Sequence, residues 1–465
     1  MLRVHGRRLC CIRLAAAFLL VSFVQVMWSP LQLGVTQHHV IRTPITVRPA
    51  ALTEPSTKEG AELHCSDLNA TSVDGVRWTP VPSPQLGEAG PYCVLYNWLL
   101  AALQPAANQS VTLCTHATAD GAAQHAPLLA AAWSAPVSLA VFVLPGEAGA
   151  LAGRLAYLRR CDASFRRHVS VHLVLERRRP PALARLPAVA AQGADCERPP
   201  APAEPSRRRQ LGLPYPVNVA RNAARRAART RFVLVSDAEL VPSPSAVTMF
   251  MDMLARQSRD QALLAGRVRS PLANATNKQY RRVYVLPVFE VQNRLPTSKA
   301  DLIRMAQAKE AVWFHRYVCP HCQKFPGVNQ YFSRPFTPGR LQPLSIVKRE
   351  VPYHRWEPIY IGTQAEPLYD ERLSWEGKQD KMTQMTELCL RGYRLVILDQ
   401  VFLTHVPQPG GIRRQPGFTD PSDVWRARFV SQNQRVYDSI IHGLKLKYGG
   451  DTKRCVVNTR KVKKA

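Results

Sequence analysis

The sequence carries little negative charge. It has 33 Asp and Glu residues against 62 Lys and Arg residues, a formal net charge of +29. Such an excess often indicates nucleic-acid binding. Here the basic residues are scattered or stand in loop-like arginine runs at 177–179 and 207–209, and no nucleic-acid-binding motif accompanies them. We therefore expect no nucleic-acid partner, and instead an anionic ligand, anionic glycans, a membrane surface or simply a solvated basic surface.

The sequence also lacks a convincing small-x-small cleavage site after its apolar amino-terminal run. Residues 14–28 contain no charge and follow Arg3, Arg7, Arg8 and Arg13. The run is shorter than the roughly 20 residues of a typical span, but it extends back to residue 9 if the last arginine snorkels. Positive flanking charge keeps the amino terminus cytoplasmic. We predict a cytoplasmic tail (1–13) and an uncleaved signal anchor (14–28), in preference to a cleaved signal peptide.

Three N-glycosylation acceptors favour a lumenal body for the rest of the chain. They are Asn69, Asn108 and Asn274, each two residues before a Ser or Thr. A single-pass type II membrane protein follows from the anchor and the acceptors together.

A second pair of zinc ligands is not evident beside the Cys-x-x-Cys pair, Cys319 and Cys322. The pair is compatible with half a zinc site, a redox pair or a structural cystine, and we expect a disulfide. Nine cysteines follow the apolar run. In an oxidising compartment most should pair, and the odd count leaves at least one free or intermolecular.

The order of the predicted elements indicates an α/β fold. Residues 29–60 are polar and read as a stem, and residues 61–134 as a cystine-containing lead-in. Beyond them, β-rich apolar runs alternate with helical spacing, which predicts a mostly parallel sheet. Residues 177–209 are predicted to be a surface loop. The predicted strands are 137–144, 169–175, 232–235 and 284–291, the last broken at Pro287, and the predicted helices are 148–160, 217–229, 247–256 and 298–311.

Two acidic side chains, Asp237 and Glu239, follow the predicted strand 232–235 directly. Ligand sites in open α/β sheets lie outside the carboxyl ends of strands. Two carboxylates at such an end can hold a divalent cation, and the cation can hold a diphosphate. The alternative is a strand followed by an ordinary Asx-type turn.

A series of motifs runs from residue 215 to residue 405: Tyr215-Pro216, Asn218, Arg221-Asn222, Asp237-Ala238-Glu239, Pro242-Ser243, Trp356-Glu357-Pro358, Tyr369-Asp370-Glu371-Arg372, Glu387, Gly392-Tyr393 and Phe402-Leu403-Thr404-His405. In combination and order, these motifs resemble glycosyltransferase family 49. The resemblance covers about residues 135–445 and leaves 446–465 as a basic carboxyl-terminal tail. Glu239 departs from the family pattern, which has Asp as the second acid.

The resemblance implies a Rossmann-like GT-A fold that binds Mn²⁺ and a UDP-sugar. It further implies an inverting enzyme of the Golgi membrane that transfers glucuronic acid from UDP-glucuronic acid, in β1,4 linkage, to a xylose-terminated glycan of a glycoprotein, during protein O-mannosyl glycan assembly. A complex with other glycosyltransferases is a further expectation. The alternatives are transfer of another UDP-sugar such as GlcNAc or xylose, and a catalytically silent relative that binds glycans or a partner enzyme.

The expected metal ligands are Asp237, Glu239 and His405, since Mn²⁺ accepts oxygen and imidazole ligands and stabilises charge on the leaving diphosphate. His405 can also be a hydrogen-bonded histidine at a strand end. Inversion requires a base for the acceptor hydroxyl. The candidates are Asp370 and Glu371, whose alternative role is pairing with a neighbouring arginine or a helix amino terminus.

The remaining expected site residues bind the two substrates. Arg221 and Asn222 contact the donor or orient the metal-binding acid. Trp356, Glu357 and Trp375 are expected at the acceptor, where the indoles stack on sugar rings. Packing in the core is the alternative for both tryptophans.

Overall fold

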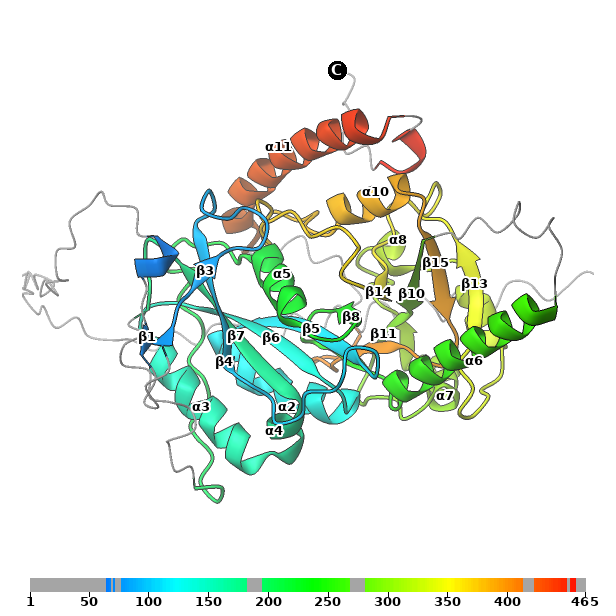
Figure 1. Ribbon diagram of the computed structural model, residues 1–465, viewed down its shortest axis with the longest axis horizontal. Helices are drawn as coiled ribbons and strands as arrows, with labels where there is room; N and C mark the ends of the chain where they lie inside the picture. Colours follow the sequence, from blue (N-terminus) through cyan, green and yellow to red (C-terminus); the bar gives the residue numbers. More distant parts are fainter. Residues whose placement is uncertain are drawn as a thin grey trace, which may run out of the picture. The chain divides into compact units, whose positions relative to one another are not determined.

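A ten-stranded mixed sheet with helices on both faces forms the centre of the protein (Figure 1). The computed structural model describes residues 64–67, 70–71, 77–181, 195–267, 281–412, 422–449 and 452–456, all within one unit, Ala61–Ala465. The predicted tail, anchor and stem lie outside the described residues, as do Asn69 and Asn274. No helix within the described ranges is long and apolar enough to cross a membrane.

Four adjacent parallel strands form the middle of this sheet. Their order is β7 (Val169–Glu176), β6 (Val137–Val143), β5 (Val111–Thr118) and β8 (Phe232–Val235). Every residue of β6 is buried, as expected for a parallel strand covered on both faces. The predicted strands 137–144, 169–175 and 232–235 are thereby confirmed, while β5 arises within the predicted lead-in.

Alternate residues of these strands contact helices on opposite faces. Leu139 and Val141 pack in the core with α2 (Ala119–Trp133), α3 (Ala148–Cys161) and α4 (Ala163–His168). Ala140 and Phe142 pack on the other face, with α5 (Val217–Ala227). Figure 1 shows α5 lying across the sheet between the labels of β3 and β8. Residues of α5 therefore contact both the sheet and the segment that precedes α10 (Met382–Leu390).

The sheet is mixed at its margins, so the predicted mostly parallel arrangement holds only at its centre. On one side β4 (Tyr92–Leu99) and β3 (Val81–Pro82) continue from β7 in antiparallel pairs. On the other side the order is β14 (Ile359–Gly362), β10 (Arg282–Leu286), β15 (Arg394–Leu398) and β13 (Pro343–Val347), with only β10 and β15 parallel. A separate two-stranded sheet pairs β1 (Ala70–Thr71) with β2 (Arg77–Trp78).

A second, four-stranded sheet has the order β12 (Ala311–Trp313), β11 (Val288–Val291), β16 (Leu403–His405) and β9 (Leu240–Pro242). The predicted break at Pro287 is the point where the chain leaves β10 in the large sheet and enters β11 in the small one. Strand β16 pairs antiparallel with β9, and His405 lies opposite Leu240. This pairing brings His405 next to the acidic turn after β8.

The main fold extends across two of the predicted domain boundaries, at residues 134 and 445. Residues 61–134 supply β3, β4, β5 and α2 to the main fold, and α11 (Ser422–Tyr448) runs across residue 445. Figure 1 shows α11 beside α10. The other helices are α6 (Ala246–Arg267), α7 (Lys299–Gln307), α8 (Pro320–Gln323), α9 (Val328–Ser333) and α10 (Met382–Leu390), with short 3₁₀ turns at Cys65–Asp67 and Thr452–Arg454.

The disulfide expectation is confirmed for the described cysteines. Four bridges form, Cys65–Cys93, Cys161–Cys196, Cys319–Cys322 and Cys389–Cys455. The ninth, Cys114, is free and buried. Burial raises the pKa of the Cys114 thiol to about 12, so it is an inert core residue.

Candidate active site

A cavity of about 500 Å³ opens at the carboxyl ends of β5 and β8. The chain proceeds from β5 outward through β6 and β7 and then returns to place β8 on the other side of β5, so strand order reverses at this point. Open α/β sheets bind ligands at such a position, and the volume suits a small-molecule site. The lining residues are His116, Ala117, Thr118, Asp120, Gly121, His125, Pro205, Ser206, Arg208, Arg209, Tyr215, Asp237, Ala238, Glu239 and Trp375.

Asp237 lines the cavity within a cluster of cations. Its Oδ1 accepts hydrogen bonds from Arg221 Nη2 (2.9 Å) and His116 Nε2 (3.2 Å), and its Oδ2 accepts from Lys381 Nζ (2.7 Å). Tyr215 Oη lies 2.9 Å from His116 Nδ1. A neutral imidazole that donates from Nε2 and accepts from Tyr215 satisfies both contacts.

The pKa shifts follow from this arrangement. Burial by itself would raise the pKa of Asp237, but the charges of Lys381 and Arg221 and the hydrogen bond from His116 hold it well below its usual value. Burial lowers the pKa of His116. Burial would also lower the pKa of Lys381, yet the nearby carboxylates, Asp237 foremost, raise it. At neutral pH the site therefore contains an ionised Asp237, a charged Lys381 and a neutral His116.

Arg221 connects this cluster to the residues before α10. Its guanidinium, 2% exposed, also pairs with Asp380 and donates to Asn218 Oδ1 at 3.0 Å. Asn218 in turn donates to the backbone carbonyls of Asp370 and Asp380. Helix α5 thus fixes both the acid after β8 and the loop that carries Lys381.

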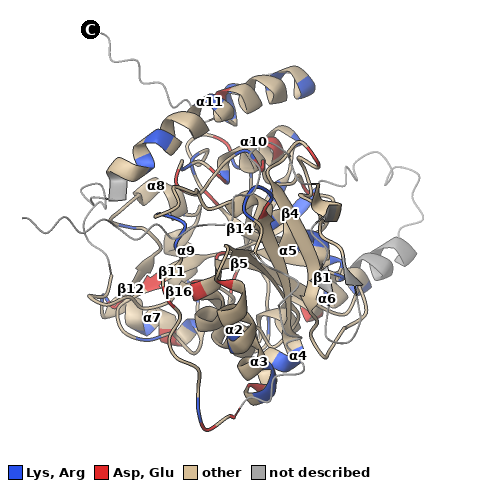
Figure 2. Cartoon of the chain, turned by 90° about the vertical axis from the view of Figure 1, so that its left-hand side faces the viewer, with Lys and Arg blue, Asp and Glu red and all other residues tan. Residues whose placement is uncertain are grey.

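Glu239 is paired with His405. Glu239 Oε2 lies 3.1 Å from His405 Nε2, and the Val406 N–H donates to the Glu239 carbonyl at 2.9 Å. Phe314 stacks on the His405 ring with centroids 5.0 Å apart. The hydrogen bond from His405 is the main cause that lowers the pKa of Glu239. In Figure 2 acidic segments, in red, lie between the labels of β5 and β16.

The predicted three-ligand group is not assembled around one point. In the described part of the chain, three ligand atoms lie within 4.8 Å of one another only at Cys319, His321 and Cys322. Asp237 faces Lys381 and Arg221, whereas His405 faces Glu239. The structure therefore brings together two of the three expected ligands, and a cation bound directly to Asp237 would have to compete with Lys381.

Glu239 and His405 nevertheless suit a divalent cation. A carboxylate oxygen and an imidazole nitrogen are donors that Mn²⁺ accepts. Adjacent ligands of an octahedral ion with bonds of ~2.1 Å lie ~3 Å apart, and these two ligand atoms are 3.1 Å apart. The Glu239 side chain is 56% exposed, which leaves further coordination positions for a ligand or water.

The predicted bases, Asp370 and Glu371, are instead engaged in structural contacts. Arg372 binds both oxygens of Asp370, at 2.9 and 2.7 Å. Glu371 accepts from the backbone N–H groups of residues 85 and 86 and from Asn222 Nδ2. Neither carboxylate lines the cavity. The alternative reading, in which these acids pair with neighbouring groups, is the one that the geometry supports.

The other predicted site residues divide between the cavity and the core. Trp375 lines the cavity and is 40% exposed. Trp356 is buried in the core, 2% exposed, so its indole cannot stack on a ligand. Burial raises the pKa of Glu357, which lies near Lys381. Arg221 and Asn222 lie beneath the cavity and support Asp237 and the 369–371 segment.

Several residues of the site were not expected from the sequence. Arg208 and Arg209 come from the predicted surface loop 177–209, yet both line the cavity. Arg208 pairs with the fully buried Glu376, while Arg209 lies over Trp425 at 5.7 Å. In the sequence, only the run of three arginines at 207–209 could have indicated that these residues belong to a site. The other unexpected members are His116, Asp120, His125 and Lys381.

A family model described as "Glycosyl-transferase for dystroglycan" matches residues 110–449. The match covers well over half of the chain and includes the whole cavity. The chain belongs to this family. It is therefore a glycosyltransferase, and the resemblance to glycosyltransferase family 49 is confirmed.

Curated relatives carry two names. This glycosyltransferase is 28% identical to beta-1,4-glucuronyltransferase 1 of Homo sapiens over 381 residues, which cover 80% of this chain and 83% of the human protein. It is 29% identical to the protein of the same name from Danio rerio over 248 residues, 52% of this chain and about half (49%) of the fish protein. It is 25% identical to xylosyl- and glucuronyltransferase LARGE2 of Rattus norvegicus over 239 residues, 48% of this chain and 30% of the rat protein.

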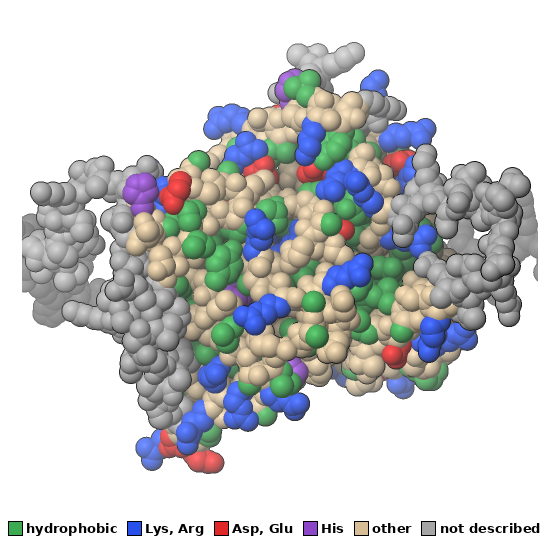
Figure 3. Space-filling model, in the orientation of Figure 1, with side chains coloured by type: hydrophobic (Ala, Val, Ile, Leu, Met, Phe, Trp, Pro, Cys, Tyr) green, Lys and Arg blue, Asp and Glu red, His purple; other side chains and the backbone are tan. Residues whose placement is uncertain are grey.

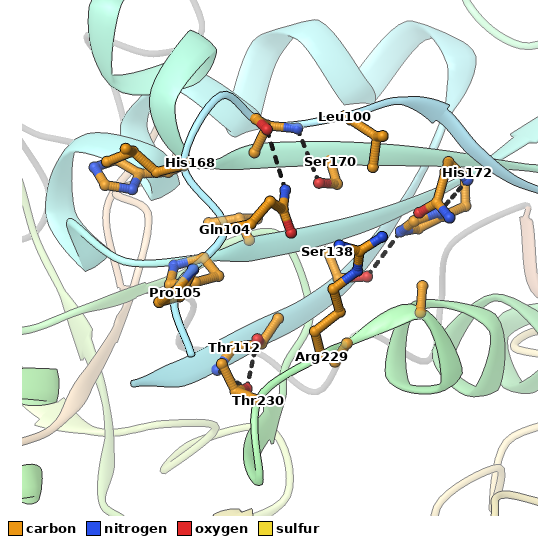
Figure 4. A pocket seen from close by; sticks show the side chains of 17 residues that line it. Leu100, Gln104, Pro105, Thr112, Ser138, His168, Ser170, His172, Arg229 and Thr230 are labelled. Atoms are coloured by element: carbon orange, nitrogen blue, oxygen red, sulfur yellow. Dashed lines mark hydrogen bonds between the residues drawn. The ribbon is translucent and has the colours of Figure 1, made fainter. Parts of the chain in front are cut away.

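A much smaller cavity, about 30 Å³, lies at the opposite, amino-terminal edge of the same parallel strands (Figure 4). It contains Ser138 and His172, with Ser138 Oγ 3.0 Å from His172 Nε2. The pair is not a nucleophile and base. His172 Nδ1 accepts the Asn97 N–H at 2.9 Å, and Ser138 Oγ donates to the Ala224 carbonyl at 2.6 Å. The imidazole must therefore donate to the hydroxyl, which is the wrong direction for activating it.

This buried histidine makes the stability of the glycosyltransferase depend on pH. Burial lowers the pKa of His172 from 6.5 to about 3. The pKa of His172 in the folded protein lies below its pKa in the unfolded chain. The neutral imidazole therefore contributes fully to the free energy of unfolding above pH 6.5, and this contribution is lost as the pH falls towards 3. Between pH 7 and pH 4.5 the wild type should lose about 3 kcal/mol more of its free energy of unfolding than His172→Gln does, as measured by urea unfolding. The exposed His442→Gln serves as the control, and equal pH profiles for wild type and His172→Gln would contradict the assignment.

Proposed function

We propose that this glycosyltransferase is an inverting β-1,4-glucuronyltransferase. It transfers glucuronic acid from UDP-glucuronic acid to a xylose-terminated glycan on a glycoprotein, during protein O-mannosyl glycan assembly, in a GT-A fold. The observation that carries the proposal is the cavity at the β5–β8 edge, where Asp237 and Glu239 project beside free positive charge. The relatives that match most of the chain bear the name of this activity.

The cavity offers complementary groups to an anionic donor. Arg209 lines it and has no ion-pair partner among the residues that the structure describes. UDP-glucuronic acid carries a diphosphate and a carboxylate, and a guanidinium binds either group through paired hydrogen bonds. Asp120 also lines the cavity, and its Oδ1 has no hydrogen-bond partner within the described ranges. This oxygen can accept a hydrogen bond from a donor N–H or hydroxyl.

We propose that Glu239 and His405 hold the Mn²⁺ ion. When bound, the ion supplies Lewis-acid stabilisation of the charge that develops on the leaving diphosphate. Asp237 then serves as a fixed negative charge beside the ion, oriented by Arg221 and balanced by Lys381. The two acids of the Asp-x-Glu segment thereby have different tasks.

Trp375 is the candidate acceptor platform. It lines the cavity, and the guanidinium of Arg426 from α11 lies 4.4 Å from its ring centroid. A partly exposed indole that lines the cavity is suited to stacking on a sugar ring. No nucleic acid is proposed as a partner. Figure 3 shows Lys and Arg spread over the visible face without a single stripe.

The donor is tested with UDP-release assays on several UDP-sugars in the presence of xylose-terminated and galactose-terminated acceptors. We expect turnover of UDP-glucuronic acid with formation of a β-linked product on the xyloside. We also expect Arg209→Met to raise the KM for UDP-glucuronic acid about tenfold, equivalent to ~1.4 kcal/mol, because one charge contact is lost.

Arg166→Met is the matched control, since Arg166 is an exposed arginine on α4 and does not line the cavity. Turnover of UDP-GlcNAc alone would overturn the glucuronyl assignment and leave the glycosyltransferase assignment intact. Absence of turnover with every donor would favour a silent, glycan-binding relative.

We also propose a Golgi membrane location, with residues 14–28 as a type II anchor, and association with other glycosyltransferases in that compartment. Asn108 is exposed in a turn, as a glycosylation acceptor must be. Endoglycosidase treatment of the full-length protein from cells should increase its gel mobility, and Asn108→Gln should remove one step of that shift. A protein that is cytosolic and unshifted would contradict the location.

A further inference from the structure

The turn formed by Cys319, Pro320, His321 and Cys322 takes no part in the proposed transfer. It lies between β12 and α9, and both cysteines are half-buried while His321 is exposed. The cysteines form a disulfide within the turn. The proposed sugar transfer therefore makes no use of this chemically reactive disulfide.

This disulfide is poorly suited to holding the fold together. The other three bridges join residues separated by 28, 35 and 66 positions, whereas Cys319 and Cys322 are three positions apart. The stabilisation that a disulfide gives by restricting the unfolded chain grows with the logarithm of the closed loop. The shortest loop therefore gains the least, and a structural role alone does not account for the bridge.

The surroundings of the turn favour a thiolate. His321 Nε2 lies 3.5 Å from Cys319 Sγ. Partial burial and the charge of Arg355 lower the pKa of His321, so at neutral pH its imidazole is neutral and available as an N–H donor. Lys324 and Arg316 both lie over the ring of Trp313 in the same segment. Partly exposed cysteines in electropositive surroundings are the reactive ones.

We propose that Cys319–Cys322 is a thiol–disulfide exchange site for an anionic low-molecular-weight thiol of the glutathione class. The positive groups around the turn attract the carboxylates of such a peptide. The half-buried sulfurs suit a small attacking thiol better than a folded protein domain. The site is independent of sugar transfer.

The exchange balances in two steps. The thiolate of the first small thiol attacks Cys322 Sγ, forms a mixed disulfide there and expels Cys319 as a thiolate, which the His321 N–H stabilises before it takes a proton. A second small thiolate attacks the mixed disulfide and releases Cys322 as a thiol. Two small thiols are oxidised to one disulfide, and one protein disulfide is reduced to two thiols. The reverse sequence reoxidises the pair.

The test equilibrates the native full-length protein with glutathione buffers of graded thiol-to-disulfide ratio, followed by alkylation and peptide mass spectrometry. We expect Cys319–Cys322 to be reduced first and reversibly, at ratios that leave the other bridges intact. Cys161–Cys196 is the internal control, because Cys196 is exposed and Cys161 half-buried, yet no imidazole contact to either sulfur is found in the described ranges. Reduction of Cys161–Cys196 before Cys319–Cys322, or reduction of Cys319–Cys322 only on unfolding, would overturn the proposal.

The role of the imidazole is tested by the rate of exchange. We expect His321→Ala to slow reduction of Cys319–Cys322 by glutathione about tenfold at pH 7, while His354→Ala leaves the rate unchanged. His354 is the matched control because it lies near enough to His321 for their charges to interact, while no contact between its ring and either sulfur is present in the part of the chain that the structure describes. Equal rates for wild type and His321→Ala would show that the site lacks the proposed thiolate stabilisation.

Discussion

A buried arginine holds the two sides of the site together. The guanidinium of Arg221 is nearly inaccessible and binds Asp237 after β8 and Asp380 before α10. A buried charge is costly unless it is paired and hydrogen-bonded, so the folded chain must keep both carboxylates in place. The orientation of Asp237, the position of Lys381 and one wall of the cavity all follow from this requirement, before any ligand binds.

The second constraint is the pairing of β16 with β9. It places His405 beside Glu239, although 166 positions separate them in the chain. Because Asp237 is already balanced by Arg221 and Lys381, the metal proposed for this site is assigned to Glu239 and His405. The Glu239 side chain reaches the imidazole of His405 from this turn.

The sequence predicted the parts of the fold that depend on local pattern. Strand β8 and the break at Pro287 were predicted correctly because a continuous apolar run and a proline have local consequences. Strand β5 was missed because it carries buried polar residues, such as Thr112 and His116, that are satisfied by distant partners. The structural contacts of Glu371 were not foreseen for the same reason, since its partners include a backbone turn about 285 residues earlier. Hydrogen bonds across such separations leave no periodic pattern in the sequence.

The division of tasks between the two acids is tested most directly by Mn²⁺ affinity, measured by isothermal titration on folded variants. The account predicts that Glu239→Gln and His405→Ala each weaken Mn²⁺ binding by at least ~10-fold. It predicts a smaller loss for Asp237→Asn, whose carboxylate is held by Arg221 and Lys381. Thermal unfolding of each variant confirms that the fold is retained. The largest loss of affinity in Asp237→Asn, with Glu239→Gln close to wild type, would contradict the account.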